Sequence, residues 1–223
     1  SSAASDVYKR QESIWIFETD KKDIKIENST AIRTETLNGV EEELHTELYI
    51  NENIEDYVRC NLVVDEIKSI KARALGKDLN GVIVKNRYEA FYRESDGNLV
   101  VYANKNAALI IKQIFNDKFD FDYKARTIVL EEVINSSNNV RKAQFKDVKI
   151  ETLTGGMING DQVHNTEIFG LMDDSGNLST VGVVYPLFDK EVSFTISIYG
   201  SILLYTSLTY EECLELINQL LEL

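Results

Sequence analysis

Acidic side chains are concentrated between residues 35 and 66, where ten Asp and Glu residues accompany one base, Arg59. Such a cluster can attract a cationic surface or imitate nucleic-acid phosphates, although it is also typical of a solvated protein face. We expect the cluster to dock a basic protein or macromolecular complex. The residues expected to bind that partner are Glu41, Glu42, Glu43, Glu47, Glu55 and Asp56.

The sign of the charge reverses directly after this stretch. Seven bases follow, against only Asp78 and Glu89: Lys68, Lys71, Arg73, Lys77, Lys85, Arg87 and Arg93. Alternation in an extended strand would place Lys85, Arg87, Phe91 and Arg93 on one face. With the later bases Arg141 and Lys142, these residues define an alternative function, a nucleotide- or nucleic-acid-binding module in which Phe91 stacks on a base. Cross-strand ion pairing is the competing explanation.

Catalytic chemistry has weaker signals. A metal-dependent nuclease is a further alternative, because Asp120, Asp122 and Lys124 share one side of an expected strand near Glu131–Glu132. The glycine-rich segment 154–161 lacks the Lys-Ser/Thr of a P-loop and fits a loop between strands better. His45 and His164 are far apart in sequence. We therefore expect a non-catalytic protein, and we assign neither metal ligands nor a cofactor.

The elements that position these residues follow from hydrophobic periodicity. Apolar positions four apart after residue 39, and a similar stripe stopped by Gly76, predict helices over 39–50 and 62–75. Two further helices are predicted over 106–116 and 209–222, the second opening with a Thr209/Glu212 capping box. Strands are predicted over 13–18, 23–27, 31–36, 82–92, 99–103, 119–134, 140–152, 163–172, 178–186, 191–198 and 202–206.

Together these elements predict an α+β fold, a mainly antiparallel sheet with helices packed on one face. Residues 88–115 and 193–220 each read as strand, tight turn, strand and helix, so the sheet could contain two ββα units. We expect residues 12–223 to form a single α+β domain, with possible sub-units 12–80 and 81–223. Residues 1–11 are expected to be a non-native leader, because Asp6–Gln11 resembles a translated transposon end used in sequencing libraries.

Composition bounds the class of protein. The chain has 223 residues, 43% of them hydrophobic, and a formal net charge of -13. The apolar runs are too short to cross a bilayer, so we expect a soluble protein without a membrane partner. Cys60 and Cys213 are expected to be free thiols in a reducing compartment, the cytoplasm. An abundance of Ile, Lys, Asn and Glu suggests a bacterial or phage origin, and a phage or defence-system regulator would fit this size and charge.

Overall fold

The computed structural model describes residues 12–223, so the expected leader, residues 1–11, lies outside the described residues. The chain divides into two compact units. One comprises Trp15–Lys124, and the other comprises Ala125–Leu223 with residues 12–14. Residues 80 and 81, between the two sub-units we expected, both lie within one strand of the Trp15–Lys124 unit.

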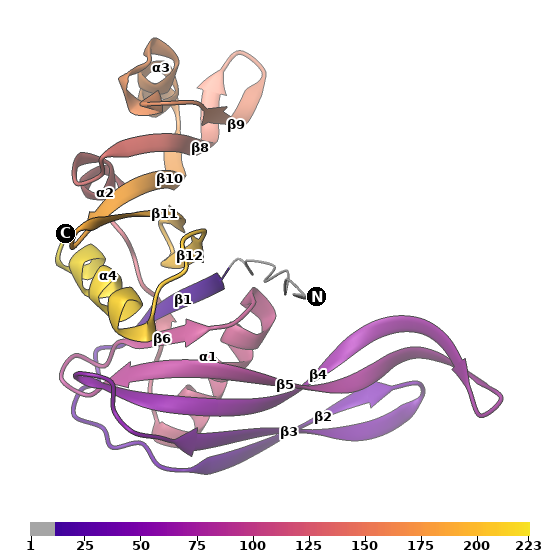
Figure 1. The fold of residues 1–223 in the computed structure, drawn as a ribbon. Helices are drawn as coiled ribbons and strands as arrows, with labels where there is room; N and C mark the ends of the chain where they lie inside the picture. Colours follow the sequence, from indigo (N-terminus) through magenta and orange to yellow (C-terminus); the bar gives the residue numbers. More distant parts are fainter. Residues whose placement is uncertain (1–11) are drawn as a thin grey trace, which may run out of the picture. The chain divides into compact units, whose positions relative to one another are not determined.

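The Trp15–Lys124 unit is built on an antiparallel sheet. Its strands are β2 (Ser29–Leu37), β3 (Val40–Ile50), β4 (Tyr57–Ala74), β5 (Lys77–Arg93) and β6 (Leu99–Tyr102), in that spatial order, with β1 (Glu12–Glu18) beside β6. Helix α1 (Lys105–Phe119) follows β6 (Figure 1). Its apolar residues Ile111 and Phe115 are buried in one cluster with Leu62 and Tyr92 from the sheet.

Four regions differ from the predicted elements. The predicted helices at 39–50 and 62–75 are wrong, because both segments are strands, β3 and β4. The predicted strand at 23–27 is also wrong, since this segment forms no strand. The predicted strand at 119–134 is replaced by a segment whose aromatic side chains join the core beneath α1, then β7 (Lys124–Ala125) and helix α2 (Leu130–Asn135).

Two tight turns explain why β3 and β4 are strands. Asn38 and Gly39 have φ angles of 53° and 82°, and Leu75 and Gly76 have φ angles of 50° and 76°. Two consecutive residues with positive φ form the type I′ turn, whose twist suits a two-residue β-hairpin. Each turn therefore reverses the chain, and the two hairpins are β2–β3 and β4–β5.

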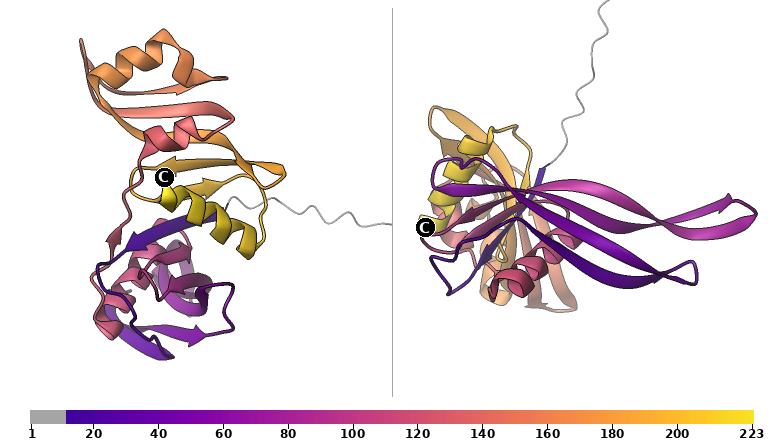
Figure 2. Two further views of the ribbon diagram at one scale, coloured as in Figure 1. Left: turned by 90° about the vertical axis from the view of Figure 1, so that its left-hand side faces the viewer. Right: turned by 90° about the horizontal axis from the view of Figure 1, so that it is seen from below.

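The β4–β5 hairpin is the longer of the two and extends past the end of β2–β3 (Figures 1 and 2). The turn of the shorter hairpin rests on β5, where the Asn38 amide donates to the carbonyl of Gly81 at 3.0 Å and its oxygen accepts from the Asn80 N–H at 2.8 Å. Residues 69–80 run from this contact to the β4–β5 turn and back, and we call them the arm. All of the arm is exposed except Ile70 and Leu79, which are half-buried.

The second unit is also built on antiparallel strands. The spatial order is β12 (Ser201–Leu204), β11 (Lys190–Ser197), β10 (Asn177–Leu187), β8 (Asn139–Ile150) and β9 (Leu153–Asn159). Helix α4 (Tyr210–Glu222) opens with the predicted Thr209/Glu212 capping box, which is confirmed. The predicted strand at 163–172 is wrong, because a 3-10 turn (Val163–Asn165) precedes helix α3 (Glu167–Ser175), capped by the Thr166 hydroxyl.

The predicted fold class is confirmed at the level of α+β with a mainly antiparallel sheet. Helix α1 follows the β5–β6 pair and α4 follows the β11–β12 pair in the chain, but the repeated ββα unit stays a prediction. Within residues 12–223, no helix is both long and apolar enough to cross a membrane.

Candidate macromolecular interaction surfaces

Strand β3 carries three carboxylates on one face, Glu41, Glu43 and Glu47, which we call the acidic row. The alternate residues Leu44, Thr46 and Leu48 are buried, so the acidic row faces away from the core. Side chains two residues apart in a strand recur about every 6.8 Å. The row is therefore an extended set of negative charges on a rigid strand, with one gap at His45, whose Nε2 lies 3.9 Å from a Glu43 oxygen.

The outer neighbouring strand, β2, places no base opposite these carboxylates. The residues of β2 opposite Glu41, Glu43 and Glu47 are all threonines, namely Thr36, Thr34 and Thr30. The one base in β2, Arg33, belongs to the other face, where its Nε bonds to Glu35 at 3.1 Å and its Nη2 donates to the Asp65 carbonyl. Within the described chain, neither β2 nor β3 offers a Lys or Arg on the face of the acidic row.

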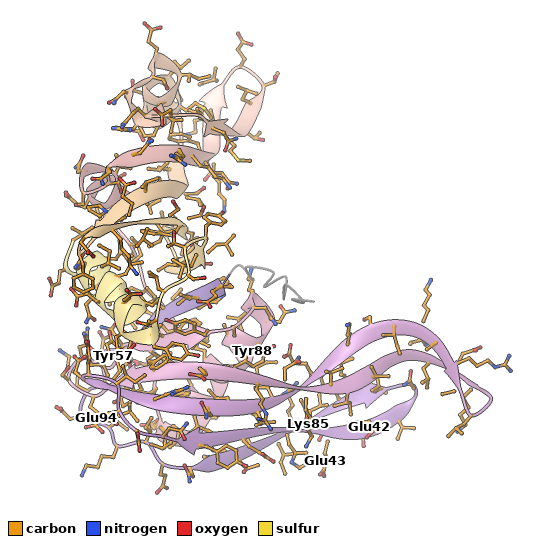
Figure 3. The ribbon with its side chains drawn as sticks, in the orientation of Figure 1. Glu42, Glu43, Tyr57, Lys85, Tyr88 and Glu94 are labelled. Carbon is orange, nitrogen blue, oxygen red and sulfur yellow. The ribbon has the colours of Figure 1, made fainter. Side chains whose placement is uncertain are left out.

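The six acids predicted to bind a partner do not form one surface. Glu42 lies on the opposite face of β3 from Glu43 (Figure 3). Glu55 and Asp56 lie beyond the far end of β3, in the turn before β4. An Asp56 oxygen is 3.5 Å from Nη1 of Arg93. The structure thus brings together Glu41, Glu43 and Glu47 and separates the other three from them.

Strand β2 is the outermost strand of its sheet, and in the described residues no strand pairs with its far side. It is nine residues long, rich in threonine, and carries Ile32 with 58% of its surface exposed. A long exposed edge of this kind is a template for an added strand, because half of its backbone N–H and C=O groups point outward without ladder partners. Sequence reasoning missed this feature, since it depends on which strand ends the sheet.

The basic residues predicted for nucleic-acid binding are also divided. Lys85, labelled in Figure 3, and Arg87 are exposed on one face of β5, opposite Asp65 and Val63 of β4. Val63 also pairs with Glu47, so these two bases share the face of the acidic row, two strands inward from β3. Phe91 is 0% exposed and packs edge-to-face on Tyr102, so its ring has no free face for a base. Arg141 and Lys142 belong to β8 in the other unit.

Arg93 is held in a network around the β5–β6 turn. Its Nε donates to Asp96 at 3.0 Å, and its guanidinium lies 4.9 Å from the centroid of the Tyr57 ring. Burial alone would raise the pKa of Asp96, but hydrogen bonds from Arg93 and from the Asn98 amide lower it on balance. These contacts occupy Arg93 in stabilising the turn.

The arm gathers several bases, of which Lys71 and Arg73 fall in the segment predicted as a helix over 62–75. Lys71, Arg73 and Lys77 lie on it and Lys68 lies at its base, against the single acid Asp78, 4.0 Å from Arg73. Leu75 at the turn is fully exposed. The signal that could have revealed the arm is the pair Leu75-Gly76 between two runs that pair as strands.

The residues considered for metal or anion chemistry do not converge. Asp120 bonds to Lys21 at 2.9 Å, Asp122 accepts from Thr19, and Glu131–Glu132 lie in α2 of the other unit. Across residues 12–223, no three His, Cys, Asp or Glu side chains are grouped closely enough to hold a metal ion.

The glycine-rich segment forms most of strand β9, so the predicted loop is wrong. Gly156 there makes room for α3, because a Cβ at this position would lie 2.2 Å from Cε of Met172. The glycine serves packing between strand and helix, and the segment forms no phosphate-binding loop.

Comparison with known proteins adds no relative, since no family model matches the chain and no curated protein matches its sequence.

Proposed function

We propose that this protein is a non-catalytic interaction protein that docks an extended, basic segment of a partner protein along β2. The observation that carries the proposal is the acidic row, whose partners in β2 are all threonines and which lies one strand in from a free sheet edge. The edge supplies backbone hydrogen-bonding groups and the row supplies charge selectivity. Strand addition to an exposed edge is a common mode of peptide recognition.

The spacing of the two features suits one ligand. A strand added to β2 would lie about 9–10 Å from β3, two inter-strand spacings away. The side chains of β2 opposite the three glutamates, Thr30, Thr34 and Thr36, are short, while the larger Ile32 lies opposite His45, in the gap of the row. Long Lys or Arg side chains of the added strand can therefore reach over the threonines to the glutamates. An extended segment also repeats its side chains about every 6.8 Å, which is the repeat of the acidic row. The preferred partner therefore has Lys or Arg at alternate positions.

The acidic row and the free edge of β2 contribute to binding in different ways. Exposed ion pairs stabilise a complex by about 0.2–1 kcal/mol each, so the acidic row supplies selectivity and a faster association rate more than affinity. The affinity comes from the added ladder, in which each hydrogen bond contributes about 0.5–1.5 kcal/mol. Binding should weaken as salt is added, because the carboxylates are exposed to solvent.

A peptide titration tests the proposal. Fluorescence anisotropy would compare a labelled peptide of alternating Lys and Thr with a peptide of the same composition whose lysines are adjacent. We expect the alternating peptide to bind at least about tenfold more tightly, and Glu41→Lys/Glu43→Lys/Glu47→Lys to abolish that binding. Ile32→Lys should also weaken it, because a charge on an edge strand opposes strand addition.

A matched control makes the same change in net charge at positions away from the acidic row and β2. Asp173→Lys/Asp174→Lys/Glu222→Lys replaces exposed acids near the C-terminal ends of α3 and α4, where cations are tolerated. This control should bind the alternating peptide as the wild type does. Equal loss in the control, or equal affinity for the two peptides, would refute the proposed docking.

The compartment that we propose is the cytoplasm. Cys60 and Cys213 are both buried, and neither forms a disulfide within residues 12–223. Burial raises the pKa of Cys60 to about 12. Buried cysteines outside disulfides are typical of proteins kept in a reducing compartment.

A further inference from the structure

The arm has charge and shape that the proposed peptide docking does not use. It is a two-stranded ribbon whose side chains are almost all exposed, and an isolated ribbon of this kind is at best marginally stable in water. It carries Lys71, Arg73 and Lys77 with one acid, while the chain as a whole has a net charge of -13. We infer that the arm binds duplex DNA by entering a groove, with its bases contacting phosphates.

The dimensions of the arm suit a DNA groove. The major groove of B-form DNA is about 12 Å wide and admits a two-stranded β-ribbon. Residues 69–75 span about 20 Å at the usual rise of a strand, which is enough to cross the groove. On one face of the arm, Ala74 pairs with Lys77 and Ala72 pairs with Leu79. The β4 side of this face therefore carries only short side chains. The major groove of duplex RNA is deep and narrow, so the arm should prefer DNA.

An exposed leucine at the tip of the arm and a bulge at its base also suit binding in a groove. Leu75 projects fully into solvent at the turn, where an apolar side chain can contact a thymine methyl group or a base step. A register shift between Ser69 and Ala72 sets Ile70 and Lys71 opposite the single residue Asn80. A bulge of this kind increases the right-handed twist of a ribbon, which helps the arm to follow a curved groove.

The length of the arm explains how an acidic protein can approach DNA. The β2–β3 turn contacts Gly81, and Leu75 lies about 20 Å farther along the ribbon. The Debye length is about 8 Å at physiological ionic strength, so phosphates at the tip are screened from the acidic row. At very low salt this screening weakens, and the carboxylates oppose binding.

Salt-dependent anisotropy with a labelled DNA duplex tests the inference. Each phosphate contact contributes about -0.9 to the slope of log K against log salt. The three bases of the arm together with Lys68 at its base therefore predict a slope of about -3.6 and an affinity loss of about 150-fold between 50 and 200 mM. Lys71→Ala/Arg73→Ala/Lys77→Ala should flatten the slope to about -0.9. Leu75→Ser should lower the affinity without changing the slope, because it removes no charge.

The matched control is Lys22→Ala/Lys25→Ala/Lys118→Ala, which removes three bases from other parts of the same unit. It should leave the slope and the affinity for DNA unchanged. Fluorescence of the single tryptophan, Trp15, which packs on the core of this unit, would show that every variant is folded.

Several results would overturn the inference. They are an absence of DNA binding between 50 and 200 mM salt, equal losses in the arm variant and the control, or duplex RNA bound as tightly as DNA. A change in the sedimentation of the arm variant with DNA binding unaltered would instead show that the arm contacts a second copy of the chain. Peptide docking on β2 should be unaffected by the arm variant, so the two proposals fail independently.

Discussion

A pair of glycine substitutions tests whether residues 39–50 form a strand or a helix. Gly39 and Gly170 both have open space where a Cβ would be added, with no atom within 4 Å. They differ in backbone conformation, because Gly39 has a φ of 82° in the β2–β3 turn and Gly170 lies within helix α3. Substitution by alanine therefore isolates conformational preference from packing.

The two substitutions should change stability in opposite directions. A left-handed conformation costs an L-residue about 1–2 kcal/mol, while alanine lowers the entropy of the unfolded chain by about 0.4–1 kcal/mol, so Gly39→Ala should destabilise by about 1 kcal/mol. Gly170→Ala should stabilise by about 0.5–1 kcal/mol, the difference in helix propensity. The variants should thus differ by close to 2 kcal/mol.

Urea unfolding followed by Trp15 fluorescence reports on the unit that contains Gly39, because Trp15 packs on its core. Differential scanning calorimetry reports on both units and would detect a transition for α3. About 1 kcal/mol shifts the melting temperature of a domain of this size by roughly 4 °C. If residues 39–50 were helical, Gly39→Ala would be neutral or stabilising, and such a result would refute the hairpin.

Three further predictions concern stability and reactivity. The pKa of Asp96 is lowered in the folded state, so its interactions stabilise the fold above about pH 4 and are lost as pH falls through the folded pKa. The stability difference between wild type and Asp96→Asn, measured by urea unfolding, should therefore shrink from pH 7 to pH 3. A constant difference would contradict this. Gly97→Ala should destabilise the fold by about 3 kcal/mol in the same assay, because the φ of Gly97 is 75° and the new Cβ would lie 2.5 Å from the Lys21 carbonyl oxygen. A loss of stability smaller than that of Gly39→Ala would contradict the close approach of Gly97 to Lys21. Cys60 should react with a thiol reagent at pH 8 only after denaturation, since burial raises its pKa to about 12, and rapid labelling of the native protein would count against its burial.

The sequence predicts the class of fold but not its two long hairpins, β2–β3 and β4–β5. Val40, Leu44 and Leu48 recur every four residues, which fits one side of a helix and equally one face of a strand, because four is a multiple of two. The deciding signal was Asn38-Gly39, a dipeptide strongly preferred in type I′ turns. The helix predicted over 39–50 gives this dipeptide no role in a turn, so the hairpin was missed.

The candidate surfaces were partly predictable for the same reason. Charge is readable from sequence, so the acidic segment and the basic segment that follows it were found. Which of their residues share a face depends on the correct period, and the even-numbered Glu42 was therefore grouped with Glu41 and Glu43. Burial was the harder property: Phe91 faces away from the α1 core as expected for its strand, yet it is covered.

The type I′ turn at Leu75-Gly76 makes the arm an adjustable part of the molecule. Adding one residue to each strand beside this turn would lengthen the ribbon by about 3.3 Å and rotate the tip to the opposite face, whereas adding two would restore its orientation. Residues 71–78 are exposed and belong to no core cluster of the described residues, so such insertions would leave the packing of the unit intact. Evolution could therefore retune the reach and the aim of the arm in discrete steps, separately from the stability of the body that carries it.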